Sequence, residues 1–214
     1  MLIIMSTNQI LHELRESEQL QFLMQYSEKP EKVVVCFVDL VNSTEMTSQI
    51  PAKKIVRFYE IFLNFVAKSV EGFNAKIIKN LGDSILFYFV SNETNDIKFF
   101  ERCVECCNSL LNEQDKINSL LDAEGLPRIN YRISADYGEV IFGKSSTSYV
   151  DDIIGECVDI IGDINHFGLP HEVIIGKDLY NQLQFSKIYK LSKDREIRIC
   201  DEAYSTYLVK KDGD

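Results

Sequence analysis

Two aspartates occupy positions where divalent cations can be held. Asp39 directly follows an apolar run at 33–38, and Asp83 separates two apolar runs at 75–81 and 84–90. A single aspartate at a strand end usually forms a turn or caps a helix, so neither residue indicates chemistry alone. If the first run lies beside a hairpin made by the other two, both carboxylates project from the same end of a sheet. They would repel each other there unless cations bind between them.

Such a pair of carboxylates suits magnesium. Mg²⁺ usually binds one or two carboxylates together with the phosphates of a substrate. Two ions held in this way activate an attacking hydroxyl and stabilise a leaving phosphate. Asn42 to Glu45, which follow Asp39 closely, look like a helix start with a capping side chain and an acid three residues later.

The elements that must position these residues follow from local patterns. Residues 33–38 read as a strand buried on both faces, and Gly82-Asp83 suits a tight hairpin. The order of all the elements suggests an α+β fold with a ferredoxin-like antiparallel sheet and helices on one face. The other predicted elements are a helix over 52–71, a continuous or once-broken helix over 97–122, a strand over 129–135, a turn near Tyr137-Gly138, a strand over 140–142, a helix over 158–167, a strand over 172–176, a helix over 177–183, and edge strands from 187 to 209.

The N-terminal part has a different pattern. Residues 9–27 predict an amphipathic helix, or two short ones, which Lys29-Pro30 ends. We therefore expect a helical extension over 1–30 and one domain over 31–214. Packing of the extension on the chain's own core is the simpler expectation, and a dimer or regulatory contact is the alternative.

The charge and hydropathy of the chain exclude several classes of function. A formal net charge of -10 argues against a nucleic-acid groove and against docking on an anionic membrane. It still permits a phosphate-bearing substrate, because metal ions bridge carboxylates to phosphates. No apolar run approaches the roughly 20 residues of a membrane span. The apolar run at 2–5 is too short for a signal peptide, so we expect a cytoplasmic protein with reduced thiols.

Other reactive side chains are assigned to the core or the surface. Cys103, Cys106 and Cys107 suggest a metal cluster at first, but they fit the apolar stripe of a helix, and no second cysteine pair or nearby histidine completes four ligands. Core packing is therefore expected, with metal or redox chemistry as the alternative. His12, His166, His171, Ser43 and Ser84 form no metal spacing and no nucleophile–base pair.

Four segments together resemble one enzyme family. Phe37 to Thr44 resembles the first metal motif of class III nucleotidyl cyclases, and Lys79 to Phe87 resembles the second. Arg132 to Val140 is similar to the family's next strand-turn-strand. Asp152 to Gly155 resembles the short motif before the last active-site helix. The resemblance spans residues 33 to about 183 and implies the class III nucleotidyl cyclase fold.

The resemblance also implies roles for the residues in these motifs. Asp39 and Asp83 would bind two divalent cations, Mg²⁺ or Mn²⁺, with the Leu40 carbonyl as a further ligand. The ribose 3′-hydroxyl of a nucleoside triphosphate would attack the α-phosphate, and pyrophosphate would leave. The terminal phosphates would bind at the start of a helix, around Asn42, Ser43 and Thr44.

Members of this family form head-to-tail dimers with composite sites, so the resemblance implies a homodimer. One subunit gives the metal ligands and the other gives the groups that read the base. Lys79 and Asp152 match the positions where adenine-specific members carry a lysine and an aspartate. A surface lysine and a loop acid are the alternative interpretation, and Asp151 can take the place of Asp152 in the alignment.

Two positions depart from the family pattern. Asp159 and Asp163 stand where the family carries an asparagine and an arginine, and an acid cannot do the work of an arginine. The domain is then inactive, or another cation replaces the arginine, or the pocket is rebuilt for another base. The candidate cations are Arg128, Arg132 and Lys144, and Lys210 and Lys211 are candidates for the family's C-terminal phosphate-binding lysine.

Small bacterial pyrimidine cyclases of anti-phage defence resemble class III enzymes at the metal motifs and diverge around the base. The chain is similarly small, so we expect a cyclase that makes 3′,5′-cyclic UMP or cyclic CMP. The first alternative is an adenylate cyclase, supported by Lys79 and Asp152. The second is a degenerate module that dimerises or binds nucleotide without turnover.

Overall fold

The computed structural model describes residues 24–90, 96–145, 151–199 and 202–211, so residues 9–23 of the helical segment predicted over 9–27 lie outside the described residues. Its strands are β1 (Met24–Tyr26), β2 (Glu31–Leu40), β3 (Lys76–Leu81), β4 (Ser84–Val90), β5 (Tyr131–Ser145), β6 (Asp151–Ile154), β7 (Val173–Gly176), β8 (Tyr189–Ile199) and β9 (Glu202–Lys211). Its helices are α2 (Ser43–Ser48), α3 (Ala52–Glu71), α4 (Ile97–Asn112), α5 (Gln114–Ala123), α6 (Glu156–Phe167) and α7 (Lys177–Leu183). None of these helices is long and apolar enough to span a membrane.

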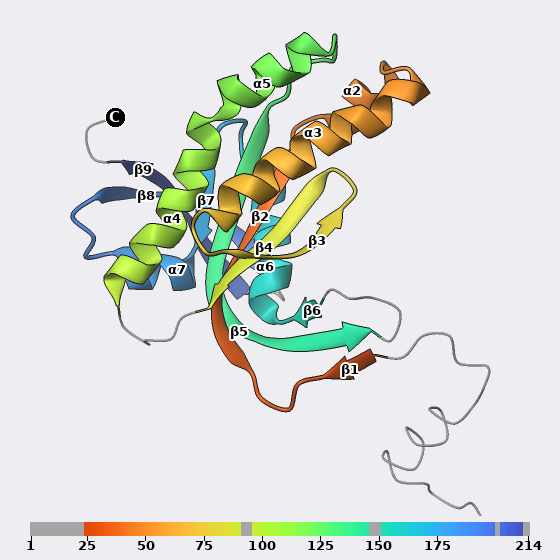
Figure 1. The fold of residues 1–214 in the computed structure, drawn as a ribbon. Coiled ribbons are helices and arrows are strands. Elements are labelled where there is room, and N and C mark those ends of the chain that lie inside the picture. The colour runs from red at the N-terminus through yellow and green to blue at the C-terminus, as the bar shows by residue number, and fades with distance from the viewer. Residues whose placement is uncertain (1–23, 91–95, 146–150, 200–201, 212–214) are drawn as a thin grey trace, which may run out of the picture.

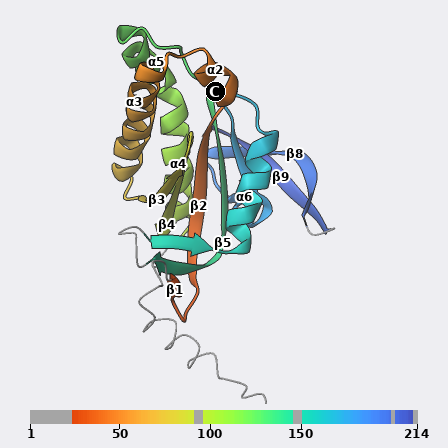
Figure 2. The same cartoon turned by 90° about the vertical axis from the view of Figure 1, so that its right-hand side faces the viewer.

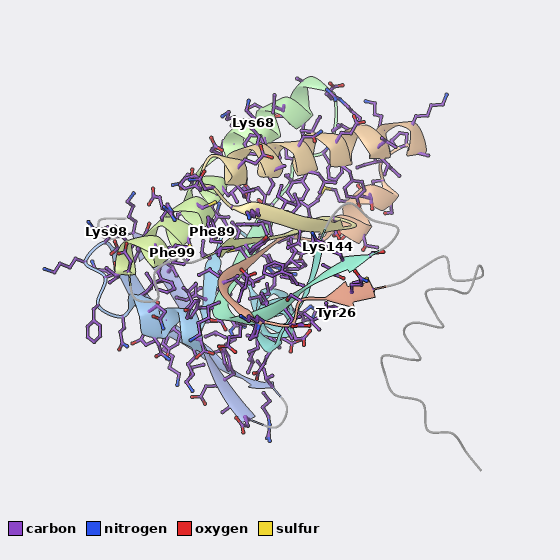
Figure 3. All side chains as sticks on the ribbon, turned by 60° about the horizontal axis from the view of Figure 1, so that its bottom comes forward. Tyr26, Lys68, Phe89, Lys98, Phe99 and Lys144 are labelled. Atoms are coloured by element: carbon purple, nitrogen blue, oxygen red, sulfur yellow. The ribbon has the colours of Figure 1, made fainter. Side chains whose placement is uncertain are left out.

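The strands form one sheet in the order β3-β4-β2-β5-β7-β9-β8. The pair β5–β7 is parallel, and the other neighbours along this path are antiparallel. The far half of β5 leaves the main sheet and pairs with β1 and β6, which makes an arm at the bottom of Figure 1. Figure 3 shows Tyr26 and Lys144 close together on this arm. The α+β class and the antiparallel sheet are therefore confirmed.

Helices cover both faces of the sheet, so the predicted placement of helices on one face is wrong. Figure 2 shows α3, α4 and α5 on one side and α6 on the other. The cause lies in β2, which is apolar on both faces. Val34 and Cys36 belong to the larger core under α3 and α4, whereas Val33 and Val35 belong to a second core with Ile161 of α6. Leaving either face open would expose a continuous apolar surface to water.

The cysteines pack in the core, as predicted. Cys36, Cys103, Cys106 and Cys107 are buried in the larger core, and the sulfurs of Cys36 and Cys107 lie 3.9 Å apart. Burial raises the pKa of the Cys36 thiol well above its ordinary value. Within the described ranges, no three His, Cys, Asp or Glu side chains are grouped so that they can hold a metal. Neutral, inaccessible thiols are inert.

Two local predictions are wrong. Met24–Tyr26, which the helical pattern of 9–27 included, is a strand paired with β5. The turn predicted at Tyr137-Gly138 is absent, because β5 runs through these residues without interruption. Gly138 serves close packing instead: a Cβ built there would lie 2.8 Å from the Cβ of Cys157 on α6. Of the two alternatives for residues 97–122, the structure has the broken helix, with the break at Glu113 between α4 and α5.

Asp136 of β5 joins three elements inside the fold. Its Oδ1 accepts the N–H of Leu179 in α7 at 2.9 Å, and its Oδ2 accepts the hydroxyl of Tyr204 in β9. The residue is fully buried. Burial raises the pKa of Asp136 from its ordinary 3.8 to about 6, although these two hydrogen bonds act in the opposite direction.

This raised pKa makes stability depend on pH. The native state binds the proton more tightly than the unfolded state, so the contribution of Asp136 is complete below pH 3.8 and is lost as the pH rises through about 6. Asp136→Asn removes this titration. We expect the free energy of unfolding of the variant, relative to wild type, to increase by about 2–3 kcal/mol between pH 4 and pH 7.5. Urea unfolding of both proteins across this range measures the difference, and a constant difference would contradict the raised pKa.

Candidate active site

Asp39 and Asp83 lie at the same end of the sheet. Asp39 of β2 is directly opposite Ser84 of β4, and Asp83 is the residue before Ser84 in the turn between β3 and β4. Gly82 allows this tight turn, because its φ of 66° is left-handed. The arrangement agrees with the prediction that β2 lies beside the hairpin. Both aspartates line one open pocket of about 380 Å³, together with Leu40, Asn42, Ser43, Thr44, Glu45 and Arg132.

Both carboxylate oxygens of Asp39 are hydrogen-bonded. The hydroxyl of Ser84 donates to Oδ1 at 2.6 Å, and Nη2 of Arg132 donates to Oδ2 at 2.9 Å. The side chains of Asp39 and Arg132 are only 17% and 19% exposed. An ion pair at this depth is screened less than a surface pair and fixes the direction in which the carboxylate points.

Arg132 has a separate partner for each of its three guanidinium nitrogens. Besides Nη2, its Nε donates to Oδ1 of Asn165 at 2.9 Å, and its Nη1 donates to the carbonyl of Gly168 at 3.1 Å. Asn165 lies on α6, and Gly168 is the first residue after that helix. The cation beside Asp39 is therefore held by the element on the opposite face of the sheet from α3.

Helix α2 starts at Ser43, as predicted, but without the predicted capping side chain. Asn42 has left-handed backbone angles, φ 58° and ψ 31°, and makes no side-chain cap hydrogen bond. A capping side chain reaches the helix amides from an extended backbone, which Asn42 lacks. The first N–H groups of a helix have no acceptor inside the helix, and the helix dipole favours anions there. The residues at this helix start line the pocket beside the aspartates.

The residues predicted to read the base lie elsewhere. Asp152 of β6 is opposite Gly143 on the arm, is half-buried, and accepts the N–H of Ile153 at 2.9 Å through its Oδ1. The backbone of Lys79 belongs to β3, which lies against β6, but its side chain is outside the described residues. The structure therefore brings the two strands together and separates Asp152 from the pocket of Asp39.

Among the candidate cations of the described chain, Arg132 alone lines this pocket. Arg128 pairs with Asp115 and Asp122 near α5, and Lys211 pairs with Glu105 on α4. The remaining candidate cations lie elsewhere. Lys144 lies on the arm, and Lys210 lines a separate pocket between α4 and β9. Asp159 and Asp163 are exposed on α6, one turn apart.

The sequence did not reveal two residues of the site. The sequence shows Ser84 as a serine without a paired histidine, and no local motif marks Asn165. The strand register gives the signal for Ser84, since counting back from the Gly82-Asp83 turn places it opposite Asp39. For Asn165 the signal is a polar residue at helical spacing from Ile161 on an apolar face.

The pocket combines the groups that a triphosphate with divalent cations requires. The carboxylates of Asp39 and Asp83 are hard oxygen ligands, which Mg²⁺ and Mn²⁺ prefer. The helix start and Arg132 supply the donors and positive charge that phosphate oxygens require. The residues present therefore fit a pair of divalent cations with a bound triphosphate.

Comparisons with known proteins point to one family. The family described as "Adenylate and Guanylate cyclase catalytic domain" matches residues 25–211. The chain is 24% identical over 188 residues to an adenylate cyclase of Anabaena cylindrica, a match that covers 84% of this chain and 37% of that protein. It is 20% identical over 182 residues to soluble guanylate cyclase gcy-31 of Caenorhabditis elegans, covering 82% and 25%. The chain thus spans well under half the length of these relatives.

Solved structures share the fold. The guanylyl cyclase Cya2 matches with a TM-score of 0.75 and 17% identity, covering 85% of this chain and 92% of that one. The adenylyl cyclase CyaB from P. aeruginosa matches with a TM-score of 0.75 and 18% identity, covering 89% and 96%. A non-canonical dimeric guanylyl cyclase domain from Blastocladiella emersonii matches with a TM-score of 0.71 and 16% identity, covering 86% of this chain and 98% of that one. Since the family match includes nearly all of the described residues, the chain belongs to the adenylate and guanylate cyclase catalytic-domain family.

Proposed function

We propose that this chain cyclises a nucleoside triphosphate to a 3′,5′-cyclic monophosphate and pyrophosphate, with Asp39 and Asp83 as ligands of two divalent cations. The observation that carries the proposal is that both aspartates and Arg132 line one pocket. Bound cations supply charge that activates the 3′-hydroxyl and stabilises the leaving pyrophosphate. The Leu40 carbonyl is the further ligand that we assign. Ser84 orients Asp39 through its 2.6 Å hydrogen bond.

We assign the triphosphate to the helix start and to Arg132. The residues that would contact it at the helix start are Asn42, Ser43 and Thr44, whose positions around the pocket allow backbone N–H groups to meet phosphate oxygens. The family carries an arginine at the position of Asp163. We assign the role of that arginine to Arg132, because Arg132 lines the pocket. Its guanidinium fork matches the geometry of phosphate oxygens and neutralises their charge.

A second copy of the chain is part of this proposal. Asp39 is opposite Arg132 on β5, whereas Asp152 is opposite Gly143, eleven residues further along the same strand. At roughly 3.3 Å per residue this is about 36 Å along the strand, and Asp152 does not line the pocket that contains Asp39. A head-to-tail homodimer brings Lys79 and Asp152 of one copy to the metal ligands of the other. A solved structure with the same fold is described as a non-canonical dimeric guanylyl cyclase domain, which supports pairing of two copies, while the head-to-tail orientation is our proposal.

For the base we favour a pyrimidine, UTP or CTP, and a cytoplasmic signalling role in anti-phage defence. The choice of base is motivated by the exposed acidic face of α6, where Asp159 and Asp163 stand in place of a neutral amide and a cation. Ionised carboxylates only accept hydrogen bonds, so this face cannot offer the donors of the family pattern. The signalling role rests on the resemblance to small bacterial pyrimidine cyclases. Adenylate cyclase is the second candidate, favoured by Asp152 beside β3 and by the relative of that name. A module without turnover is the third.

An activity assay with each of the four common nucleoside triphosphates distinguishes the pyrimidine cyclase, the adenylate cyclase and the inactive module. We expect cyclic UMP or cyclic CMP and pyrophosphate when the pure protein is incubated with Mn²⁺ or Mg²⁺. Asp39→Ala and Asp83→Ala should each lower the rate by about 100-fold or more, as loss of one charge-stabilising group does. Asp115→Ala, at an exposed acid on α5, is the control. Cyclic AMP as the main product would favour an adenylate cyclase, and no product from a folded dimer would favour the inactive module.

Ser84→Ala tests the support of the metal ligand. Loss of the hydrogen bond to Oδ1 lets Asp39 rotate, and loss of such a partner typically weakens metal binding by about 10-fold. We therefore expect a higher half-saturating Mn²⁺ concentration, both in the rate and in calorimetric binding. Ser48→Ala is the control, because the Ser48 hydroxyl bonds only to the carbonyl of Glu45 in α2. Equal Mn²⁺ affinity in Ser84→Ala and wild type would contradict this role.

Mixing two inactive variants tests the composite site. Asp39→Ala removes a metal ligand, and Lys79→Ala removes a base-reading group. A mixed dimer then carries one intact site and one site with both defects. Random exchange of equal amounts should restore about a quarter of the wild-type activity, because half of the dimers are mixed. If mixed dimers form and the activity stays at the level of the separate variants, each site is built from one chain.

A further inference from the structure

Asn165 is a polar side chain on the face of α6 that packs on the sheet. It is 2% exposed, with apolar Ile161 and Ile164 beside it on the same helix. A buried amide costs free energy unless its donors and acceptor are satisfied. Here they are satisfied, since Oδ1 accepts Nε of Arg132 at 2.9 Å and Nδ2 lies 3.3 Å from the carbonyl of Phe37 and 3.2 Å from Oγ of Ser134.

These bonds anchor Asn165 on two strands as well as on its helix. Phe37 belongs to β2, two residues before Asp39, and Ser134 belongs to β5, two residues after Arg132. The hydroxyl of Ser134 in turn donates to the carbonyl of Ile161 in α6 at 2.8 Å. The amide plane of Asn165 is therefore fixed from three directions, and it presents its oxygen to Nε of Arg132.

The consequence concerns the guanidinium plane of Arg132. An arginine side chain has many rotamers, and a single ion pair with Asp39 leaves the plane free to turn about the pair. The bond from Nε to Asn165, 2.9 Å long, and the bond from Nη1 to Gly168, 3.1 Å long, remove that freedom. They hold Arg132 against Asp39 on the wall of the pocket.

We propose that Asn165 is a positioning residue, which fixes Arg132 so that its charge lies at the triphosphate side of the pocket beside Asp39. The inference rests on the proposed role of Arg132 toward the triphosphate. Asn165 touches neither the pocket nor a substrate atom, and it acts through Arg132. An aliphatic residue would fill the same space on this apolar helix face, but it would leave Nε of Arg132 without an acceptor.

The test compares Asn165→Ala with a matched control. Asn118→Ala removes an equally buried asparagine, 4% exposed, which makes two hydrogen bonds with the backbone of Ile129 and lies away from Arg132. For Asn165→Ala we expect the KM for the nucleotide to rise about tenfold, the factor that one hydrogen bond to a charged group provides, with a far smaller change in kcat. The dissociation constant of inorganic tripolyphosphate with Mn²⁺, measured by calorimetry, should rise by the same factor.

Asn165→Asp keeps the acceptor oxygen for Nε and should restore most of the affinity for tripolyphosphate. It also serves as the second variant if Asn165→Ala does not fold. Asn118→Ala should leave KM and tripolyphosphate binding unchanged. Equal changes in Asn118→Ala and Asn165→Ala would show a general loss of packing and overturn the proposal, as would unchanged tripolyphosphate binding in Asn165→Ala.

A double-mutant cycle with Arg132→Gln tests whether Asn165 affects tripolyphosphate binding through Arg132. If Asn165 acts through Arg132, Asn165→Ala should have no further effect on tripolyphosphate binding once Arg132 is glutamine. Additive effects would overturn the inference. Arg132→Gln alone distinguishes this failure from failure of the proposed function: if it leaves tripolyphosphate binding unchanged, the assignment of Arg132 to the triphosphate is wrong. If it weakens binding and Asn165→Ala does not, only the positioning role is wrong.

Discussion

The ion pair between Asp39 and Arg132 sets the geometry on which the rest of the site depends. Both side chains are less than one-fifth exposed, so each charge loses most of its hydration. Such a pair persists only where additional hydrogen bonds satisfy the remaining atoms. Ser84 supplies one for Asp39, and Asn165 and Gly168 supply two for Arg132. Strands β2, β4 and β5 and helix α6 must therefore meet at one place.

The two hydrophobic cores bring these elements together. Strand β2 is buried on both faces, so α3 and α4 are held on one side and α6 on the other. The hairpin of β3 and β4 then extends to the same end of the sheet as β2, where Asp83 joins Asp39. Asp136, four residues after Arg132 on β5, similarly ties this strand to α7 and β9. The polar site is thus positioned by apolar packing around a strand that has no solvent-facing side.

Periodicity predicted most elements, because helices such as 52–71 and the hairpin around Gly82-Asp83 are determined by local residues. The same local patterns gave wrong predictions where contacts between distant residues determine the secondary structure. Met24–Tyr26 forms a strand because it pairs with the edge of the β5 arm. Gly138 suggests a turn in the sequence, but in the fold it allows α6 to pack closely against β5. The aspartates could be found from the strand ends, whereas the role of Asn165 depends on a hydrogen bond to a residue 33 positions away.

The two faces of helix α6 differ in burial and in chemistry. Its inner face carries Asn165 and the bond to Arg132, and its outer face carries Asp159 and Asp163 in solvent. Substitutions on the outer face leave every hydrogen bond of the inner face intact. The buried hydrogen bonds of α6 and its exposed acidic surface can therefore change independently of each other. A helix of unchanged position can keep its buried contacts with Arg132 while residues on its exposed side are substituted.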